Sequence, residues 1–194
     1  MIQSKKEYYS YLKADAKALN IETASIKSKI KNWVAPNYIW RFQKRLRKVE
    51  YYKNCANNPI SNLQHFIAKI KFRKTSLKMG FSIPENVFGP GLSIVHYGTI
   101  VINSNTKIGA NCRIHASVNI GASGGSSKAP QLGDNIYIGP GSKIYGDIKI
   151  GNNTAIGTNA VVNKSYPEGD IMLAGNPAKK IKSIDIRRII KHLE

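Results

Sequence analysis

A branched aliphatic residue recurs every six positions between residues 103 and 164, and this period limits the possible folds more than any other feature. The aliphatic positions are Ile108, Ile114, Ile120, Leu132, Ile138, Ile144, Ile150, Ile156 and Val162. A repeat this short is typical of a parallel β-helix. Steps of eighteen residues sort the positions into three columns: Ile102, Ile120, Ile138 and Ile156; Ile108, Ile144 and Val162; Ile114, Leu132 and Ile150. We therefore predict three-sided coils of eighteen residues, stacked roughly 4.8 Å apart.

The residues near each aliphatic position fit such a coil. Glycine usually follows it and suits a corner that needs unusual backbone angles, as at Gly109, Gly121, Gly133, Gly139, Gly151 and Gly157. Four residues after it, a second inward position is mostly small or branched: Cys112, Val118, Ile136, Ser142, Ile148, Thr154 and Ala160. Cys112 is therefore expected to be a buried structural thiol, and with Cys55 it forms no disulfide framework.

The first eighty residues differ from the repeat region in charge and in period. They hold 18 Lys or Arg against 4 Asp or Glu, a net charge of +14, whereas the remainder carries +5. Such an excess fits solvated helix faces equally well as a negatively charged partner. Capping residues, prolines and apolar spacing predict helices at about 4–20, 23–34, 38–53 and 61–78. Eleven of the 17 aromatic residues lie in this region, which indicates a core of its own.

The predicted fold is mainly β, with three parts. A basic α-helical domain covers residues 1–80, the β-helix covers 81–182, and a short C-terminal helix covers 183–194. No apolar stretch approaches the ~20 residues of a membrane helix, and no charged-then-apolar leader opens the chain. We expect a cytoplasmic protein.

Two histidines break the pattern of the coils, so they are the candidates for chemistry. His96 lies where the six-residue phasing blurs, and His115 takes a corner position that glycine mostly fills in other coils. The remaining histidines, His65 and His192, lie in segments expected to be helical and give no functional signal.

Five stretches make the chain similar to a known family: FGPGLSIVHYGTIVIN, IHASVNIGASGG, YGDIKIGNN, IGTNAVVNKSYPEG and AGNPAKKI. The run over 83–181, about half the chain, resembles the serine acetyltransferase branch of the hexapeptide acyltransferases, and more closely its polysaccharide-modifying members. The resemblance implies a left-handed β-helix, a homotrimer, and acetyl transfer from acetyl-CoA to a hydroxyl in a cleft between subunits.

Matching the motif residue by residue puts the catalytic base of the family on His96. An imidazole with a pKa near 6.5 can take the proton of an attacking hydroxyl at neutral pH and return it to the leaving thiolate. No covalent acyl-enzyme is needed. Backbone N–H groups of the glycine-rich segment 121–125 are the candidates to stabilise the tetrahedral oxyanion.

Three departures from the family pattern guide the prediction of the acceptor. Serine-specific members place aspartate, histidine and aspartate where this chain has Val95, Ala129 and Ser82. Because these charged groups are missing, we expect a neutral sugar hydroxyl of a surface or capsular polysaccharide, or of its precursor, as the acceptor. The side chains that could contact it are Tyr97, His115 and Asp15.

The resemblance also implies positions that bind acetyl-CoA, which acts as co-substrate. They are Gly121, Ala122, Gly139, Pro140, Thr158, Lys164 and Lys179. The two lysines suit phosphate groups. No metal is expected, and the acceptor is expected to be an acidic or lipid-linked carbohydrate, with possible contact between the basic helices and a membrane surface.

Three alternatives stay open at this point. Serine O-acetylation within the same family would show as CoA thiol release with free serine. A metal-dependent hydratase on the same scaffold would need three converging histidines. A noncatalytic nucleic-acid binder would use residues 1–80 and show salt-dependent retention, although no nucleic acid is expected as a partner.

Overall fold

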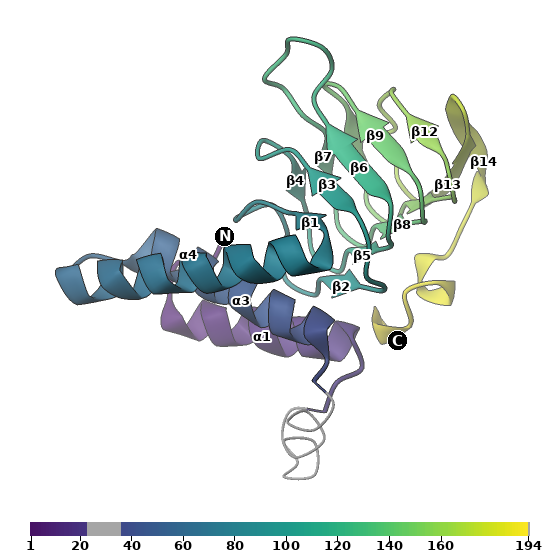
Figure 1. Ribbon diagram of the computed structural model, residues 1–194. Coiled ribbons are helices and arrows are strands. Elements are labelled where there is room, and N and C mark those ends of the chain that lie inside the picture. The colour runs from purple at the N-terminus through teal and green to yellow at the C-terminus, as the bar shows by residue number, and fades with distance from the viewer. Residues whose placement is uncertain (23–35, 194) are drawn as a thin grey trace.

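The computed structural model describes residues 1–22 and 36–193. Three helices pack beside one end of a column of stacked coils (Figure 1). They are α1 (Lys5–Ala18), α3 (Tyr38–Cys55) and α4 (Pro59–Met79). These helices lie where the sequence predicts the first, third and fourth, while the helix predicted over 23–34 lies outside the described residues.

Local signals explain where these helices begin and end. Ser4 caps α1, since its side chain accepts a hydrogen bond from the Glu7 N–H at 3.1 Å, as the capping spacing predicts. At the other end of the helical region, Gly80 ends α4 with a left-handed φ of 74°, a conformation that glycine adopts without steric cost. Phe81 then begins the first strand.

Short strands build the three faces of the column. Sheet A contains β1 (Phe81–Ser82), β3 (Ile100–Ile102), β6 (Val118–Gly121), β9 (Lys143–Tyr145) and β12 (Val161–Val162). Sheet B contains β4 (Lys107–Ile108), β7 (Gln131–Leu132) and β10 (Lys149–Ile150). Sheet C contains β2 (Ser93–Ile94), β5 (Arg113–Ile114), β8 (Tyr137–Ile138), β11 (Ala155–Ile156), β13 (Ile171–Gly175) and β14 (Ala178–Ser183). All strand pairs are parallel except β13 with β14.

The observed register corrects each of the three predicted columns where it crosses residues 122–130. Ile102 stacks on Ile120 and Ile144 on Val162, as predicted, but Ile120 pairs with Ile144 rather than with Ile138. The reason is the segment 122–130, which leaves the column as a loop (Figure 1). The step from Ile120 to Ile144 is 24 residues instead of 18, so the loop lengthens that coil by six residues. Register follows the inward aliphatic residues, so a loop that leaves the column shifts the sequence count without disturbing the ladder.

The corner glycines also serve a different purpose from the one predicted. Gly109 and Gly133 do not have positive φ; Asn111 and Asn135 take the left-handed corners instead, with φ of 58° and 59°. Gly109 is required by close stacking, because a Cβ there would lie 2.8 Å from the carbonyl carbon of Gly133 in the next coil. The need for glycine is therefore steric rather than torsional.

One hydrophobic core runs through the helices and the coils, which corrects the prediction of a separate helical core. Phe42 of α3 packs against Phe72 of α4 and against Phe81 of β1, with ring centroids 5.4 and 4.9 Å apart. All three belong to the cluster that continues into the inward aliphatics. The thiol of Cys112 is buried in the same core, as predicted. The domain limits at residues 80 and 182 stay a prediction.

The C-terminal segment is not the predicted helix. It contains two 3₁₀ turns, Ile186–Arg188 and Lys191–Leu193, that follow the β13–β14 hairpin. The description of the chain as mainly β also does not follow from the elements, because the helices have 14, 18 and 21 residues and the longest strand has six. Within the described residues, no helix combines the length and the apolar character that a bilayer crossing requires.

Candidate active site

His96 lies just after β2, where the chain turns from sheet C toward sheet A. Its side chain is exposed, and among the described residues no hydrogen bond to its ring is present. An exposed imidazole next to a rigid strand can reach a substrate proton without first leaving the core. The structure thus places the predicted base at a surface where a hydroxyl can approach.

The backbone leading to His96 is held by side chains from two helices. The Gln43 amide donates to the Leu92 carbonyl at 2.7 Å, and the Asp15 carboxylate accepts from the N–H groups of Gly91 and Leu92, both at 2.9 Å. β2 is the edge strand of sheet C, so these contacts replace the missing strand neighbour. Helices α1 and α3 therefore fix the approach of the chain to His96.

Asp15 is not an acceptor-binding residue, which corrects that prediction. It is fully buried and forms an ion pair with Arg47 at 2.8 Å. Arg47 also binds Glu50 at 3.0 Å and donates to the carbonyls of Phe88 and Gly89. Burial opposes the charge of Arg47, but the charges of Asp15 and Glu50 outweigh burial and raise the pKa of Arg47. The cluster joins helices to coils, and its carboxylates are occupied.

His115 lies one coil further along, beside His96. The two ring centroids are 6.0 Å apart. The rings of His115 and Tyr137 form an edge-to-face contact with centroids 5.2 Å apart. Burial lowers the pKa of His115, and the charges of Arg113 and His96 lower it further. Its Nε2 is buried without a partner among the described residues. His115 is therefore neutral at neutral pH.

Tyr97 is 60% exposed beside His96, so it is free to contact a ligand. Two further residues near the histidines, Arg113 and Tyr137, were not singled out by the sequence. They occupy equivalent outward positions of β5 and β8, since Arg113 pairs with Tyr137 in the ladder. The signal available in the sequence was their place immediately before Ile114 and Ile138, which makes them point outward from sheet C.

The C-terminal turns close one side of this region. Ile186 and Ile190 are buried against Ala155 on the outer face of sheet C, and Tyr137 packs against the same cluster. His192 reaches back to Asn111, with 3.4 Å between its Nε2 and the amide oxygen. The tail thereby covers the outer face of sheet C next to the ring of Tyr137.

The predicted acetyl-CoA positions divide into two groups along the column. Gly139, Pro140 and Thr158 follow strands of sheet C, on the same edge as His96 and His115. Gly121 ends a strand of sheet A, Ala122 and Lys164 follow strands of that sheet, and the exposed Lys179 lies on β14. Gly139 is buried and its N–H is engaged by the Ile156 carbonyl at 2.8 Å. It therefore serves the coil stack and offers no free donor.

The two groups lie at opposite ends of the strands of sheet A. Gly121 follows Ile120, which stacks on Ile102, whereas His96 lies six residues before Ile102 and four before the start of that strand. At roughly 3.3 Å per residue, the six residues from His96 to Ile102 span at most about 20 Å of chain. A tetrahedral oxyanion must lie about 3 Å from its donors. Within one chain, the strand end that carries the segment 121–125 therefore lies opposite to the strand end that His96 precedes.

Comparison with known proteins agrees with this architecture. Residues 129–164 match the family model described as bacterial transferase hexapeptide (six repeats). The serine acetyltransferase of Helicobacter pylori is 34% identical over 120 residues, covering 60% of this chain and 70% of that protein. The chain belongs to the hexapeptide-repeat acyltransferases. The serine acetyltransferase of Mycobacterium tuberculosis is 35% identical over 118 residues, and there the match spans about half of the relative, 51%.

Solved structures of hexapeptide-repeat acyltransferases share the fold. A serine acetyltransferase in complex with cysteine superposes with a TM-score of 0.74 at 20% identity, over 99% of this chain and 72% of that one. The Brucella abortus serine acetyltransferase in complex with coenzyme A gives 0.71 at 22% identity, over 93% and 70%. These structures have the left-handed β-helix of the hexapeptide fold.

These relatives overturn the prediction of a polysaccharide acceptor. The curated relatives and the solved structures described above are all named serine acetyltransferase, which was the alternative interpretation of the sequence. That prediction depends on the loss of three charged side chains, which Val95, Ala129 and Ser82 replace. It does not depend on any group that binds a sugar. An absent contact does not identify another ligand, because a different residue can supply the same charge.

The described residues contain no cluster of three or more His, Cys, Asp or Glu side chains placed to hold a metal ion. The two neighbouring histidines, His96 and His115, instead stand beside Tyr137 and Arg113. This set of groups suits two tasks. The imidazoles and the phenol can take part in proton transfer, and the guanidinium of Arg113 can bind a carboxylate.

Proposed function

We propose that this chain is a serine O-acetyltransferase that uses acetyl-CoA as donor. The observation that carries the proposal is the exposed imidazole of His96, located at the motif position of the family and anchored through β2 by Gln43 and Asp15. The names of the relatives support serine as the acceptor.

His96 acts as general base in this proposal. Its ring takes the proton of the serine hydroxyl while the hydroxyl oxygen bonds to the thioester carbon. As the carbon–sulfur bond breaks, His96 returns that proton to the sulfur, giving O-acetylserine and free CoA thiol. The imidazole ends the cycle in its starting form, so no covalent acyl-enzyme is required. Base catalysis of this kind is typically worth about 10²–10⁴-fold in rate.

Arg113 is proposed to bind the carboxylate of serine, and Tyr97 to accept from its ammonium group. Arg113 points outward one coil from His96 and is half-exposed, and the exposed phenol of Tyr97 is next to the base in sequence. A guanidinium recognises a carboxylate through two parallel hydrogen bonds. These two groups supply the recognition that Val95 and Ala129 cannot.

Acetyl-CoA is proposed to lie along sheet A between two copies of the chain. The N–H groups of residues 122–125 make no hydrogen bond within the part of the chain that the structure describes, so they are available as oxyanion donors. Because they follow the end of a sheet A strand opposite to the end that His96 of their own chain precedes, they are proposed to serve His96 of a neighbouring chain. A homotrimer, as predicted from the resemblance, provides such pairs of faces. Lys164 and Lys179 are proposed to meet the phosphates.

Release of CoA thiol from acetyl-CoA tests the proposal. We expect release that depends on free serine, and a loss of about 10²–10⁴-fold in kcat for His96→Ala with an unchanged far-UV circular dichroism spectrum. His65→Asn, on α4, is the matched histidine control and keeps the wild-type rate. Thiol release that ignores serine, or full activity of His96→Ala, rejects the assignment.

Arg113→Gln separates recognition from chemistry. We expect the KM for serine to rise while the KM for acetyl-CoA stays the same, because the carboxylate loses its partner and the donor does not. Arg73→Gln, which removes a cation from α4, should alter neither constant. An equal rise in both KM values would assign Arg113 to the fold rather than to serine.

A further inference from the structure

Helix α4 presents apolar side chains to solvent on the face opposite to its packed face. Ala68, Phe72 and Met79 are buried against the rest of the protein. On the other side lies an apolar stripe of exposed residues: Ile60, Leu63, Phe66, Ile67, Ile70 and Leu77. Phe66 is 63% exposed and Leu77 75%. Large apolar groups aligned along one helix face mark an interaction surface.

The spacing of the apolar stripe follows the helix. Ile60, Leu63, Ile67 and Ile70 recur at steps of three and four residues, so their side chains lie above one another along one side. The 21 residues of α4 extend about 30 Å. Figure 1 shows that the helix runs beside α3 and that its first half extends away from the coils. The stripe is therefore accessible along most of its length.

Basic residues flank the apolar stripe on both sides. Lys69 and Arg73 lie on one side of the stripe, Lys71 and Lys78 on the other, and Lys74 lies within it. All five are exposed. The chain has no Asp or Glu between Glu50 and Glu85, so no acidic side chain of α4 offsets these charges.

A row of cations on α3 continues this basic surface. Arg41, Arg45 and Lys48 face α4, where two small cavities of about 180 and 150 Å³ open between the helices. We call the six residues along this groove the basic seam: Arg41, Arg45, Lys48, Lys71, Lys74 and Lys78. One water needs only about 10–15 Å³, so each cavity accepts a larger polar group.

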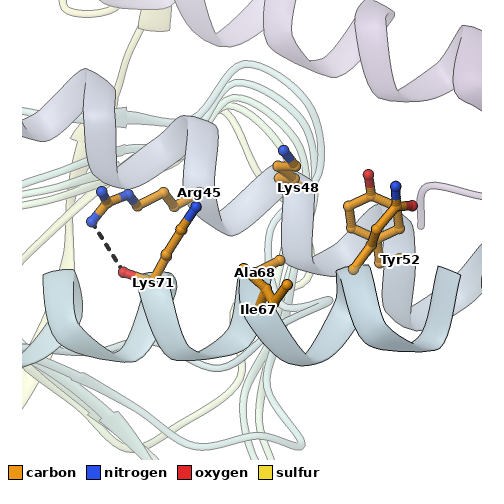
Figure 2. Close-up of a pocket in the computed structure, with 7 residues that line it drawn as sticks. Arg45, Lys48, Tyr52, Ile67, Ala68 and Lys71 are labelled. Carbon is orange, nitrogen blue, oxygen red and sulfur yellow. Dashed lines mark hydrogen bonds between the residues drawn. The ribbon is translucent and has the colours of Figure 1, made fainter. Parts of the chain in front are cut away.

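Figure 2 shows how the basic seam is arranged around the cavity of about 150 Å³. The Arg45 guanidinium donates to the backbone carbonyl of Lys71 at 3.0 Å, which fixes its position between the helices. Ile67 and Ala68 lie between this contact and Tyr52 (Figure 2). The Lys48 ammonium stands 5.9 Å from the centre of the Tyr52 ring. Cationic and apolar groups therefore meet within one groove.

Three neighbouring cations of α3, Arg41, Lys44 and Arg45, have no ion-pair partner among the described residues. Burial lowers the pKa of Lys44, and the charges of Arg41 and Arg45 lower it further. Burial likewise lowers the pKa of Arg45, with a further contribution from Arg41. An anion that binds beside such a group of like charges lowers their electrostatic free energy, so this surface favours an anionic ligand.

We propose that α4 and the basic seam dock the protein on an anionic phospholipid surface. The apolar stripe enters the boundary between headgroups and acyl chains, and the seam contacts the lipid phosphates. A helix with exposed Phe, Leu and Ile between rows of Lys and Arg has the composition that lies in a membrane interface. This proposal goes beyond acetyl transfer and does not depend on the identity of the acceptor.

Charge decides between this surface and a second copy of the chain. Two α4 faces packed together would bring five uncompensated cations against five more, which opposes association. The phosphates of a nucleic acid would pair with the cations of the basic seam, but the apolar stripe would remain in water. An anionic bilayer satisfies both features, since it offers negative headgroups above an apolar layer.

Flotation of the full chain with lipid vesicles tests the proposal. We expect binding to vesicles of phosphatidylcholine with phosphatidylglycerol, little binding to phosphatidylcholine alone, and a decline as salt screens the headgroups. The double change Leu63→Ser with Phe66→Ser should weaken partitioning at least about tenfold, because each side chain loses its transfer into the apolar layer. Ile181→Ser, an exposed residue on β14, is the matched control and binds as the wild type does.

The charge contribution has its own pair of variants. Lys69→Glu should lower binding to anionic vesicles about fivefold or more, since a lysine near such a surface contributes about that factor. Lys6→Glu on α1 changes the net charge equally and should have a smaller effect. Circular dichroism and thermal melting confirm that all variants are folded, and thiol release from acetyl-CoA measures the proposed enzyme activity separately.

Three results would overturn the docking proposal. One is equal or absent binding to the two kinds of vesicle. A second is an oligomer, measured by sedimentation, that dissociates in the Leu63→Ser and Phe66→Ser variant while vesicle binding is unchanged, which would assign the stripe to a second copy. The third is salt-dependent retention on RNA by a chain that does not float with vesicles.

Discussion

Asp15 of α1 and Arg47 of α3 form a buried two-pronged ion pair, with Oδ2 2.8 Å from Nε and Oδ1 3.2 Å from Nη2. The same carboxylate accepts hydrogen bonds from Gly91 and Leu92, five and four residues before His96. A single side chain thus connects two helices and the strand that leads to the candidate base.

Removing this carboxylate should destabilise the whole protein. Asp15→Ala leaves a buried guanidinium and two buried N–H groups without their partner, and we expect a loss of about 3 kcal/mol or more in the free energy of unfolding. Urea titration measures it. Lys53→Ala, which breaks a half-exposed pair with Glu85, should cost at most about 1 kcal/mol. A stable Asp15→Ala variant with a raised KM for the acceptor would restore Asp15 to the binding site.

Close stacking of coils predicts that Gly109→Ala is poorly tolerated. The new Cβ would lie 2.8 Å from the carbonyl of Gly133, and relieving this overlap should cost about 1–3 kcal/mol. Gly124→Ala is the matched control, because nothing lies within 4 Å of a Cβ there. The midpoint of urea unfolding compares the two variants. Equal stabilities would show that the coils can separate at Gly109 without cost.

Asparagine side chains form a ladder along one corner of the column. The amide of Asn111 donates to Asn135 at 2.9 Å, and Asn135 donates to Asn153 at 2.8 Å. Asn135→Ala loses both contacts and places an alanine at a φ of 59°, so we expect a loss of about 2 kcal/mol in unfolding free energy. Asn135→Gly avoids the torsional part and should lose less. The reverse order would show that the backbone there is not strained.

Two histidines should make stability depend on pH in the same direction. Burial lowers the pKa of His115 and of His192, so the folded state favours the neutral ring. The unfolded chain takes up protons below about pH 6.5, and stability is therefore full above that pH and falls as pH decreases through the folded pKa values. Urea midpoints across this range should fall less steeply for His115→Gln than for the wild type. An unchanged pH profile would contradict the assignment.

The sequence predicted most of the elements but not their alignment. Aliphatic period, glycines and capping residues located the coils and the helices α1, α3 and α4, because these signals act within a few residues of chain. The pairing of Ile120 with Ile144 escaped prediction, since counting cannot show that residues 122–130 leave the column. The sequence predicts a helix at the C-terminus where the chain forms 3₁₀ turns, because apolar spacing alone does not distinguish a regular helix from a tail packed on a sheet.

The candidate site was predicted in part for the same reason. His96 and His115 were visible as breaks in a regular pattern, and the structure brings their rings within 6.0 Å. Arg113 and Tyr137 do not interrupt the repeat, because outward positions of a coil accept many residue types. Asp15 was assigned to the acceptor on residue type, and burial shows that its charge is already used by Arg47.

By itself, the sequence determined the repeating coil, the basic helices and the position of the imidazole, since each depends on residue types at fixed short spacing. Tertiary structure alone decided the register across the loop, the burial of Asp15 and the exposure of the α4 stripe. These features depend on which distant surfaces meet. Whether a charged or apolar side chain is satisfied is a property of its neighbours in space, and those neighbours lie tens of residues away along the chain.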